Sequence, residues 1–452
     1  MKKLITHAYV ITVDEAFTII HDGAVCYEND RILEVGDTAD LTAKYPDAAI
    51  TDAAGKALMP GLINTHLHSG LIRGTAEDLP VWEWIALHVD PKHRVLQPDD
   101  AYIAARVCYS ESLLAGTTTV VDMYRYMHRC ADAVAETGIR AILTPYVGDR
   151  VGYEYFESVD DNEKLYLERH GDADGRINVW FGMEHIVYTS LESFRRVARL
   201  AEKYDTGIHT HGEESIQMVN MIRAKYGCAP IQEFFNRGIL GPKTLIAHCC
   251  WITPYEIEIL RSTGASIAHC PVSNMKLASG ICPVPAALEA GVAVGLGSDG
   301  VKENNNLDIF EEMKFAALLQ KIGSLNARAM PAEDVIRIAT SIGARAIGMQ
   351  DELGSLEAGK KADMVLLNLD KPHMSPVLFG KYENVVPNIV YSANGADVHT
   401  VIVNGETRVE NHQLINVDME EMLGQYQRHT EALIARREPF IPDHVSIEDV
   451  IV

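Results

Sequence analysis

The sequence predicts an α/β fold: a (β/α)8 TIM barrel with a small flanking β-sandwich domain built from both chain ends. Eight short apolar runs recur between residues 62 and 299, and helical patterning fills the stretches between them. Eight strands alternating with helices over about 240 residues fit a closed barrel better than a doubly wound sheet, which remains the alternative. Strand-like segments with turn signals stand at both ends of the chain, outside this alternating region.

These patterns divide the chain into four segments. Residues 1–58 are expected to form the N-terminal part of the β-domain, and residues 59–356 the barrel. Residues 357–416 are expected to form the C-terminal part of the same β-domain, followed by a C-terminal helix and tail at 417–452.

The β-domain is predicted because neither chain end carries enough strands for a stable sheet of its own. The front contains "KKLITHAYVITV" and "GAVCYENDRILEVGD", and the back contains "GKKADMVLLNLD" and "DVHTVIVNGETRVENHQL". The last of these includes Asn404-Gly405, a pair typical of a tight hairpin turn. We therefore expect the two ends to pair, with an amphipathic helix at 419–439 behind them.

The barrel is predicted from strand and helix patterns in alternation. Residues 191–204 and 254–264 show helical periodicity, and Gly264 is a stop signal for the second helix. The eight apolar runs cover residues 62–68, 117–123, 140–147, 177–183, 205–211, 244–248, 265–269 and 292–299.

Charge, hydropathy and cysteine content limit the expected partners and location of the protein. The net charge of −23 argues against nucleic acid or an anionic membrane as partner and favours a neutral or cationic small-molecule substrate. No apolar run is long enough to span a membrane. Eight cysteines without a C-x-x-C motif fit reduced thiols, so we expect a cytoplasmic protein.

Two histidines close the first apolar run, "MPGLINTHLHS". Alternate residues of a strand share a face, so His66 and His68 project together and can share one metal ion. Such a pair also occurs by chance as two unrelated surface histidines. The other strands decide between these interpretations, because chemistry in a barrel of this type sits at the carboxyl ends of the strands.

Several further barrel strands end in, or are followed by, a histidine or an acid. Three or four imidazoles with one carboxylate suit a borderline ion such as Zn²⁺. We infer His66, His68, His211 and Asp299 as ligands of one divalent ion. The further residues at these positions are His185, His209, His248 and His269.

Some of these residues keep two interpretations. His209 and His211 have the same parity, and the roles of His209 and His269 stay open. Glu214 is placed to move a proton at a metal site, with Glu213 less so, although both also fit an acidic helix start. His248 is either a buried core histidine or a donor to a developing oxyanion.

The motifs together resemble the amidohydrolase superfamily. More narrowly, they resemble the branch that contains S-adenosylhomocysteine/5′-methylthioadenosine deaminases and triazine hydrolases. The resemblance runs from about residue 1 to 430. The stretches that carry it are "MPGLINTHLHSGLIRGTAEDLPVWEWI", "AGTTTVVDMY", "HTHGEES", "LIAHCCWIT", "AHCPVSNMKLASGICPVPAALEAGVAVGLGSDG", "NNNLDIFEEMKFAALLQK" and "LGSLEAGKKADMVLLNLD".

The resemblance implies roles for the site residues. Glu214 becomes the proton shuttle, His248 the oxyanion donor, and Asp299 both ligand and general base. Glu77 matches a residue that holds ribose hydroxyls, and His185 matches a histidine that contacts substrate. Trp82 and Glu303 are expected to border the substrate as well. The metal is expected to be Zn²⁺, with Fe²⁺, Mn²⁺ or Co²⁺ as alternatives, and the enzyme a homo-oligomer.

Two departures bear on the substrate. The loop after Asp299 reads "VKENNN", with Lys302 and then Glu303 where relatives have serine. The third run continues "LTPYVGDR", with Pro145 where adenosylhomocysteine deaminases carry an arginine for the amino-acid carboxylate. Arg150 is a candidate to take the place of that arginine.

The leading prediction is a metal-dependent hydrolytic deaminase of an amino-substituted N-heterocycle, foremost an adenosine-type nucleoside. Metal-bound hydroxide attacks the ring carbon, and ammonia leaves. The alternative keeps the machinery and hydrolyses a triazine-, phenylurea- or thiocarbamate-type substrate with a different leaving group. A third hypothesis is an inactive barrel used for binding, against which the intact ligand set argues.

Overall fold

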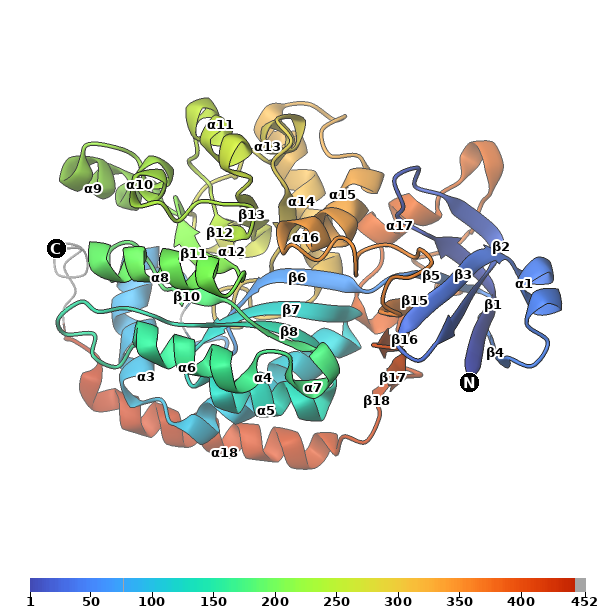
Figure 1. Ribbon diagram of the computed structural model, residues 1–452, viewed down its shortest axis with the longest axis horizontal. Helices are drawn as coiled ribbons and strands as arrows, with labels where there is room; N and C mark the ends of the chain where they lie inside the picture. Colours follow the sequence, from blue (N-terminus) through green and yellow to red (C-terminus); the bar gives the residue numbers. More distant parts are fainter. Residues whose placement is uncertain (76, 444–452) are drawn as a thin grey trace.

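The computed structural model describes residues 1–75 and 77–443, and it contains the barrel (Figure 1). Each of the eight apolar runs contains a strand, and the fourth is interrupted at Trp180. The barrel strands are β6 (Leu62–Leu67), β7 (Thr117–Tyr124), β8 (Arg140–Pro145), β9 (Ile177–Val179) with β10 (Phe181–Met183), β11 (Ile208–Gly212), β12 (Thr244–His248), β13 (Ser266–His269) and β14 (Val294–Leu296).

These strands are parallel and run in sequence order around the barrel. Every residue of β6, β7, β8, β11 and β12 is buried, as expected for strands covered on both faces. The first and last strands meet: the Thr65 hydroxyl donates to the Leu296 carbonyl at 2.9 Å, and the Asp299 amide donates to the His66 carbonyl at 3.0 Å. Gly295 permits this approach, because a Cβ there would lie 2.3 Å from the Thr65 methyl.

The helices of the barrel cover its outer surface (Figure 1). Two were predicted from periodicity and are confirmed, and the second ends at Gly264, whose φ is +78°. The helices of this layer are α4 (Pro98–Leu114), α5 (Met127–Thr137), α6 (Val159–Arg169), α8 (Leu191–Lys203), α9 (Ile216–Tyr226), α10 (Pro230–Arg237), α11 (Pro254–Thr263), α12 (Pro271–Lys276), α13 (Val284–Glu289), α14 (Ile309–Ser324), α15 (Ala332–Ala339) and α16 (Ser341–Ala346).

Shorter helical segments complete the structure between residues 38 and 440. The segment before α4 lies over the site described below. These elements are α1 (Thr38–Lys44), α2 (Val81–Trp84), the π-helix η1 (Ile85–Val89), α3 (Asp90–Val95), α7 (Asp172–Gly175), η2 (Gly380–Tyr382), α17 (Val385–Tyr391), η3 (Gly395–Asp397) and η4 (Glu438–Phe440).

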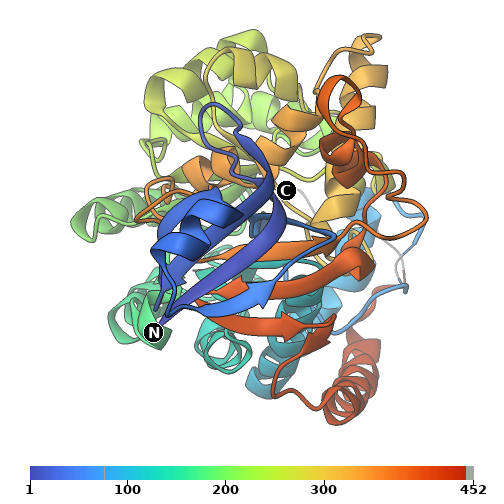
Figure 2. The ribbon, with the colours of Figure 1, turned by 90° about the vertical axis from the view of Figure 1, so that its right-hand side faces the viewer.

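The two ends of the chain share one sheet, which confirms the predicted pairing. Its nine strands are β1 (Lys2–Ile11), β2 (Ile19–Glu28), β3 (Arg31–Asp37), β4 (Ala49–Asp52), β5 (Lys56–Pro60), β15 (Met364–Asn368), β16 (Val398–Val403), β17 (Glu406–Glu410) and β18 (Gln413–Leu414). Strand β5 from the front pairs antiparallel with β15 from the back. In Figure 2 the blue N-terminal strands and the orange-red C-terminal strands lie side by side. Asn404 and Gly405, with φ of 55° and 75°, form the hairpin turn between β16 and β17.

The predicted C-terminal helix is α18 (Met419–Arg437), which packs along the barrel on α3 and α4 (Figure 1). The Tyr426 hydroxyl donates to the Gly70 carbonyl at 2.9 Å, and the Thr430 hydroxyl donates to the Leu71 carbonyl at 2.8 Å. The end of the predicted tail, residues 444–452, lies outside the described residues. Within the described ranges, none of the helices has the length and apolarity to cross a membrane.

A buried ion pair joins the barrel to the sheet. Arg140, at the start of β8, donates from Nε and Nη2 to the two carboxylate oxygens of Asp363 at 3.0 and 3.2 Å. The Asp363 carbonyl accepts from the Gly61 amide at 2.9 Å, just before β6. Both side chains are buried, so each charge depends on the other for compensation.

Arg140→Ala is expected to destabilise the protein by about 3–5 kcal/mol, because it leaves the buried Asp363 carboxylate without its cation. Chemical denaturation followed by circular dichroism measures the change. Arg261→Ala, which breaks the exposed pair with Glu258, is the control and should leave the midpoint in place. Equal midpoints for all three proteins would contradict this role of Arg140.

Candidate active site

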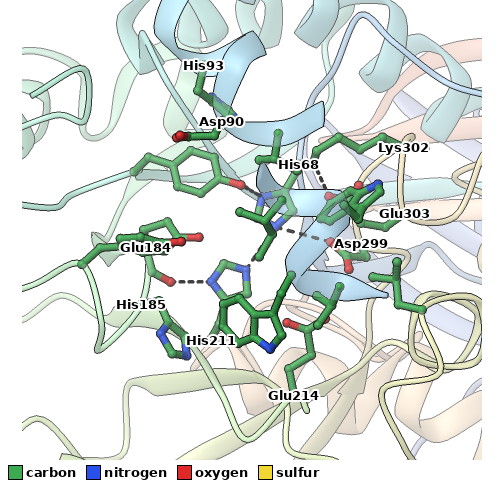
Figure 3. Close-up of a pocket in the computed structure, with 18 of the residues that line it drawn as sticks. His68, Asp90, His93, Glu184, His185, His211, Glu214, Asp299, Lys302 and Glu303 are labelled. Atoms are coloured by element: carbon green, nitrogen blue, oxygen red, sulfur yellow. Dashed lines mark hydrogen bonds and ion pairs between the residues drawn. The ribbon is translucent and has the colours of Figure 1, made fainter. Parts of the chain in front are cut away.

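The carboxyl ends of the barrel strands surround one cavity (Figure 3). His68, His211, His248 and Asp299 line it from strand ends, and Glu214 lines it from the segment after β11. His185, Trp82 and Glu303 also line it, as expected of residues beside a substrate. The arrangement therefore brings together most of the residues chosen from the sequence.

Hydrogen bonds fix the orientation of two of the imidazoles. His68 Nδ1 donates to the Met123 carbonyl at 2.6 Å, and His211 Nδ1 donates to the Glu184 carbonyl at 2.5 Å. With the protons on Nδ1, both Nε2 atoms carry lone pairs, and they face each other at 3.1 Å. Two lone pairs this close repel unless a cation lies between them.

His66 is oriented in the same way by a second histidine. His209 Nδ1 donates to the Leu245 carbonyl at 2.9 Å, so His209 Nε2 accepts from His66 Nδ1 at 2.8 Å. Both ring nitrogens of His209 are thus engaged, which leaves His211 as the histidine of β11 that faces the cavity. His66 Nε2 lies 3.5 Å from Asp299 Oδ1.

These donor atoms fit a metal ion. His66, His68 and Asp299 each offer an atom within 4.8 Å of the others, and so do His66, His211 and His248. Burial, together with the neighbouring His66, lowers the pKa of His68 and of His211 well below the usual range. Neutral imidazoles held through Nδ1 are the form in which histidine binds a divalent ion.

Asp299 is held in place by its own neighbours. Its Oδ2 accepts from the Ser273 hydroxyl at 2.6 Å, and its Oδ1 accepts from the Gly300 amide at 2.8 Å. Asp299 and His248 both have positive φ, 61° and 75°. Such backbone strain at non-glycine residues is concentrated at functional sites.

Glu214 faces the cavity, whereas Glu213 does not. Glu214 Oε1 accepts from the Ser279 hydroxyl at 3.3 Å, and burial raises the pKa of this carboxyl. Glu213 points toward the Ile231 amide, 3.4 Å away, and burial with the nearby Glu256 raises its pKa to about 9. Geometry thus separates two neighbouring acids that the sequence could not.

The structure does not place Glu77 in the cavity. Its carboxylate is held by Lys276 at 2.7 Å and accepts from the Asn305 amide at 3.2 Å. This ion pair holds the carboxylate outside the cavity lining, and its expected contact with substrate stays a prediction. His269 is fully buried and does not line the cavity, and neither of its ring nitrogens has a partner among the described residues.

The sequence analysis did not single out a second part of the lining. Glu184, Asp90 and His93 reach the cavity together with Lys302, which was noted only as a departure from relatives (Figure 3). Asp90 and His93 come from the short helix α3, and Glu184 and Lys302 from segments after strands. An aromatic wall accompanies them and includes the expected Trp82; its rings are Trp82, Trp84, Tyr146, Tyr153, Tyr155, Phe156 and Tyr188. Short helices and loops carry no long periodic pattern, so most of these residues were not marked in the sequence.

Comparison with known proteins identifies the family. The model described as "Amidohydrolase family" matches residues 57–408. The chain belongs to the amidohydrolase family. This confirms the resemblance seen in the motifs and the barrel that it implied.

Amidohydrolase relatives cover nearly the whole chain. The 5-methylthioadenosine/S-adenosylhomocysteine deaminase of Pelotomaculum thermopropionicum is 38% identical over 96% of this chain and 99% of that protein. The 5'-deoxyadenosine deaminase of Methanosarcina acetivorans is 39% identical over 96% of this chain and 98% of that protein.

Solved amidohydrolase structures share the fold. An adenosine deaminase from Xanthomonas campestris with bound zinc has a TM-score of 0.90 and 31% identity, covering 96% of this chain and 98% of that one. An atrazine chlorohydrolase from Arthrobacter aurescens complexed with zinc has a TM-score of 0.85 and 26% identity, covering 94% and 99%.

His66→Ala is expected to remove the metal, because it deletes one converging Nε2 atom. Elemental analysis of the parent protein should find about one zinc-like ion per chain. His128→Ala is the control, since His128 is an exposed histidine paired with Glu168, and it should keep the ion. Two ions per parent chain, or full retention in His66→Ala, would contradict a single site at these ligands.

Proposed function

We propose that this amidohydrolase is a metal-dependent hydrolytic deaminase of adenosine-type nucleosides. The observation that carries the proposal is the convergence of Glu214 and His248 on the point where His66, His68, His211 and Asp299 direct their donor atoms. The nearly full-length nucleoside deaminase relatives support this substrate class. A bound divalent ion, foremost Zn²⁺, supplies Lewis acidity that makes water a nucleophile at neutral pH.

The reaction replaces an amine by oxygen at a ring carbon. Water adds to that carbon, the C–N bond breaks, and ammonia leaves. Glu214 accepts a proton from the water and returns one to the departing nitrogen, a role suited to a carboxyl whose pKa is raised. Asp299 serves as ligand and as the second base.

His248 is assigned to the oxyanion. Its Nδ1 donates to the Asn274 side-chain oxygen at 3.0 Å, which turns Nε2 toward the cavity. Nε2 is proposed to donate to the oxygen that develops at the attacked carbon. Trp82 and His185 are proposed to contact the substrate, and Glu303 to border it through its ion pair with Lys302.

A second candidate keeps this machinery and changes the leaving group. The similarity to atrazine chlorohydrolase favours it, and so does the Lys302–Glu303 pair beside the substrate space. A purified-enzyme screen of aminopurines, pterins and triazines with ammonia detection separates the two candidates. A cytoplasmic location and a homo-oligomeric state remain predictions.

Glu214→Gln should lower kcat on the order of 10²–10⁴-fold and keep the metal, because it removes only the acid–base group. Glu213→Gln is a matched control: a carboxyl with a pKa of about 9 is protonated at neutral pH, so the amide resembles it closely. Steady-state kinetics with metal analysis tests both variants. Normal turnover in Glu214→Gln would place the shuttle on another residue.

Neutral nucleosides should be deaminated more efficiently than S-adenosylhomocysteine. Pro145 offers no cation, Arg150 does not line the cavity, and Lys302 is already paired with Glu303. A missing charge-assisted contact of about 1.5–3 kcal/mol corresponds to roughly 10- to 150-fold in kcat/KM. Measuring adenosine, 5′-methylthioadenosine and S-adenosylhomocysteine in one buffer tests this, and preference for the last would contradict it.

A further inference from the structure

The charges that line the cavity are out of balance. Five carboxylates line it and one lysine does, among the described residues. Two of the acids, Glu214 and Asp299, belong to the proposed chemistry. Glu303 is paired with Lys302, and Asp90 is paired with Arg94 at 3.2 Å. Glu184 remains as the acid without an assigned partner.

The Glu184 side chain is unsatisfied. It forms no ion pair with any described residue, and its Oε2 atom is buried without a hydrogen-bond partner among them. Its backbone is fully used, because its amide donates to the Val147 carbonyl at 3.0 Å and its carbonyl accepts from His211. Burial, with the nearby Glu214, raises the pKa of this carboxyl to about 8, so near neutral pH a cationic partner that arrives with a ligand is needed to hold it ionised.

Two cations at or beside the cavity have other partners. Arg94 is bound to Asp90 and lies over the rings of Tyr153 and Tyr155, at 5.8 and 5.0 Å from their centroids. Lys302 lies over the Trp84 ring at 5.2 Å in addition to its pair with Glu303. Neither forms an ion pair with Glu184.

The surroundings of Glu184 favour a cation. Phe156 packs against Tyr146 and Tyr188, with ring centroids 6.1 and 5.5 Å apart, and all three rings line the same cavity as Glu184. Aromatic faces attract cations through their quadrupoles, most strongly where water is excluded. A carboxylate beside such a wall is a recognition site for an ammonium or sulfonium group.

Figure 3 places Glu184 opposite Asp299, with His211 between them. The charged group of the ligand therefore lies away from the reacting carbon. On a nucleoside, the end remote from the ring amine is the 5′ substituent.

We propose that Glu184, with the Tyr146, Phe156 and Tyr188 rings of the aromatic wall, selects substrates that carry a positive charge on the 5′ side. This inference rests on the proposed function, since it names the substrate class of the same site. It also agrees with the acidic balance of the whole chain, whose net charge is −23.

Calorimetric binding to the zinc-loaded Glu214→Gln protein tests the inference without consuming the ligand. The probes are 5′-amino-5′-deoxyadenosine, which is a cation at pH 7, adenosine, which offers a neutral donor, and 5′-deoxyadenosine, which offers neither. We expect the amino nucleoside to bind about 10- to 100-fold more tightly than the other two. Adding Glu184→Gln should reduce the difference to less than about twofold.

Two controls keep the result specific. Glu184→Gln should retain the metal, because His211 donates to the main-chain carbonyl of this residue and not to its side chain. Glu154→Gln removes a negative charge from an exposed residue that does not line the cavity, and it should keep the preference.

The outcomes are distinct. Equal affinities for the three probes, a preference that survives Glu184→Gln, or its loss in Glu154→Gln would each overturn the inference, as would failure of all three to bind. The proposed function fails separately, if the parent enzyme releases no ammonia from any adenosine nucleoside. A charge preference in binding without ammonia release would uphold the inference and reject the deaminase.

Discussion

The site depends on where three histidine protons are held. His66, His68 and His211 each donate from Nδ1 to a fixed acceptor, so their Nε2 lone pairs point inward. The acceptors are the main-chain carbonyls of Met123 and Glu184 and the ring of His209, all of which the neighbouring barrel strands or the segments after them hold in place. Convergence of unprotonated nitrogens in a buried space requires a cation, and the closure of the barrel supplies the geometry.

Much of this arrangement could be predicted from sequence, because it follows from periodicity. The eight strands, the pairing of the two chain ends and the position of histidines at strand ends depend on local patterns and on the rule that barrel chemistry lies at carboxyl ends. The interruption of the fourth strand at Trp180 could not be predicted, because the apolar run continues through it. Strand alternation could not decide whether His209 or His211 binds the metal, since residues two apart share a face. It required the contact of His209 with Leu245.

The parts that sequence missed depend on contacts between distant segments. Glu77 stands in a stretch that matches relatives, yet Lys276, about 200 residues later, binds its carboxylate outside the cavity. Glu184 and the aromatic wall gather only after loops from several strands pack together. Glu213 and Glu214 are adjacent in sequence and face different surroundings. Side-chain direction at such points follows from backbone strain, as the φ of 52° at Glu213 shows.

The shared sheet has a consequence for how the chain reaches its fold. One edge of strand β5 pairs with β15, which is synthesised more than 300 residues later, so this edge stays open until β15 is available. The front strands can pair with one another, but a ribosome that adds about 5–20 residues per second leaves the outer edge of β5 open for tens of seconds. During that time this edge resembles the surfaces that drive aggregation. Assembly of the enzyme in a cell is therefore a late event, completed only when the last strands emerge.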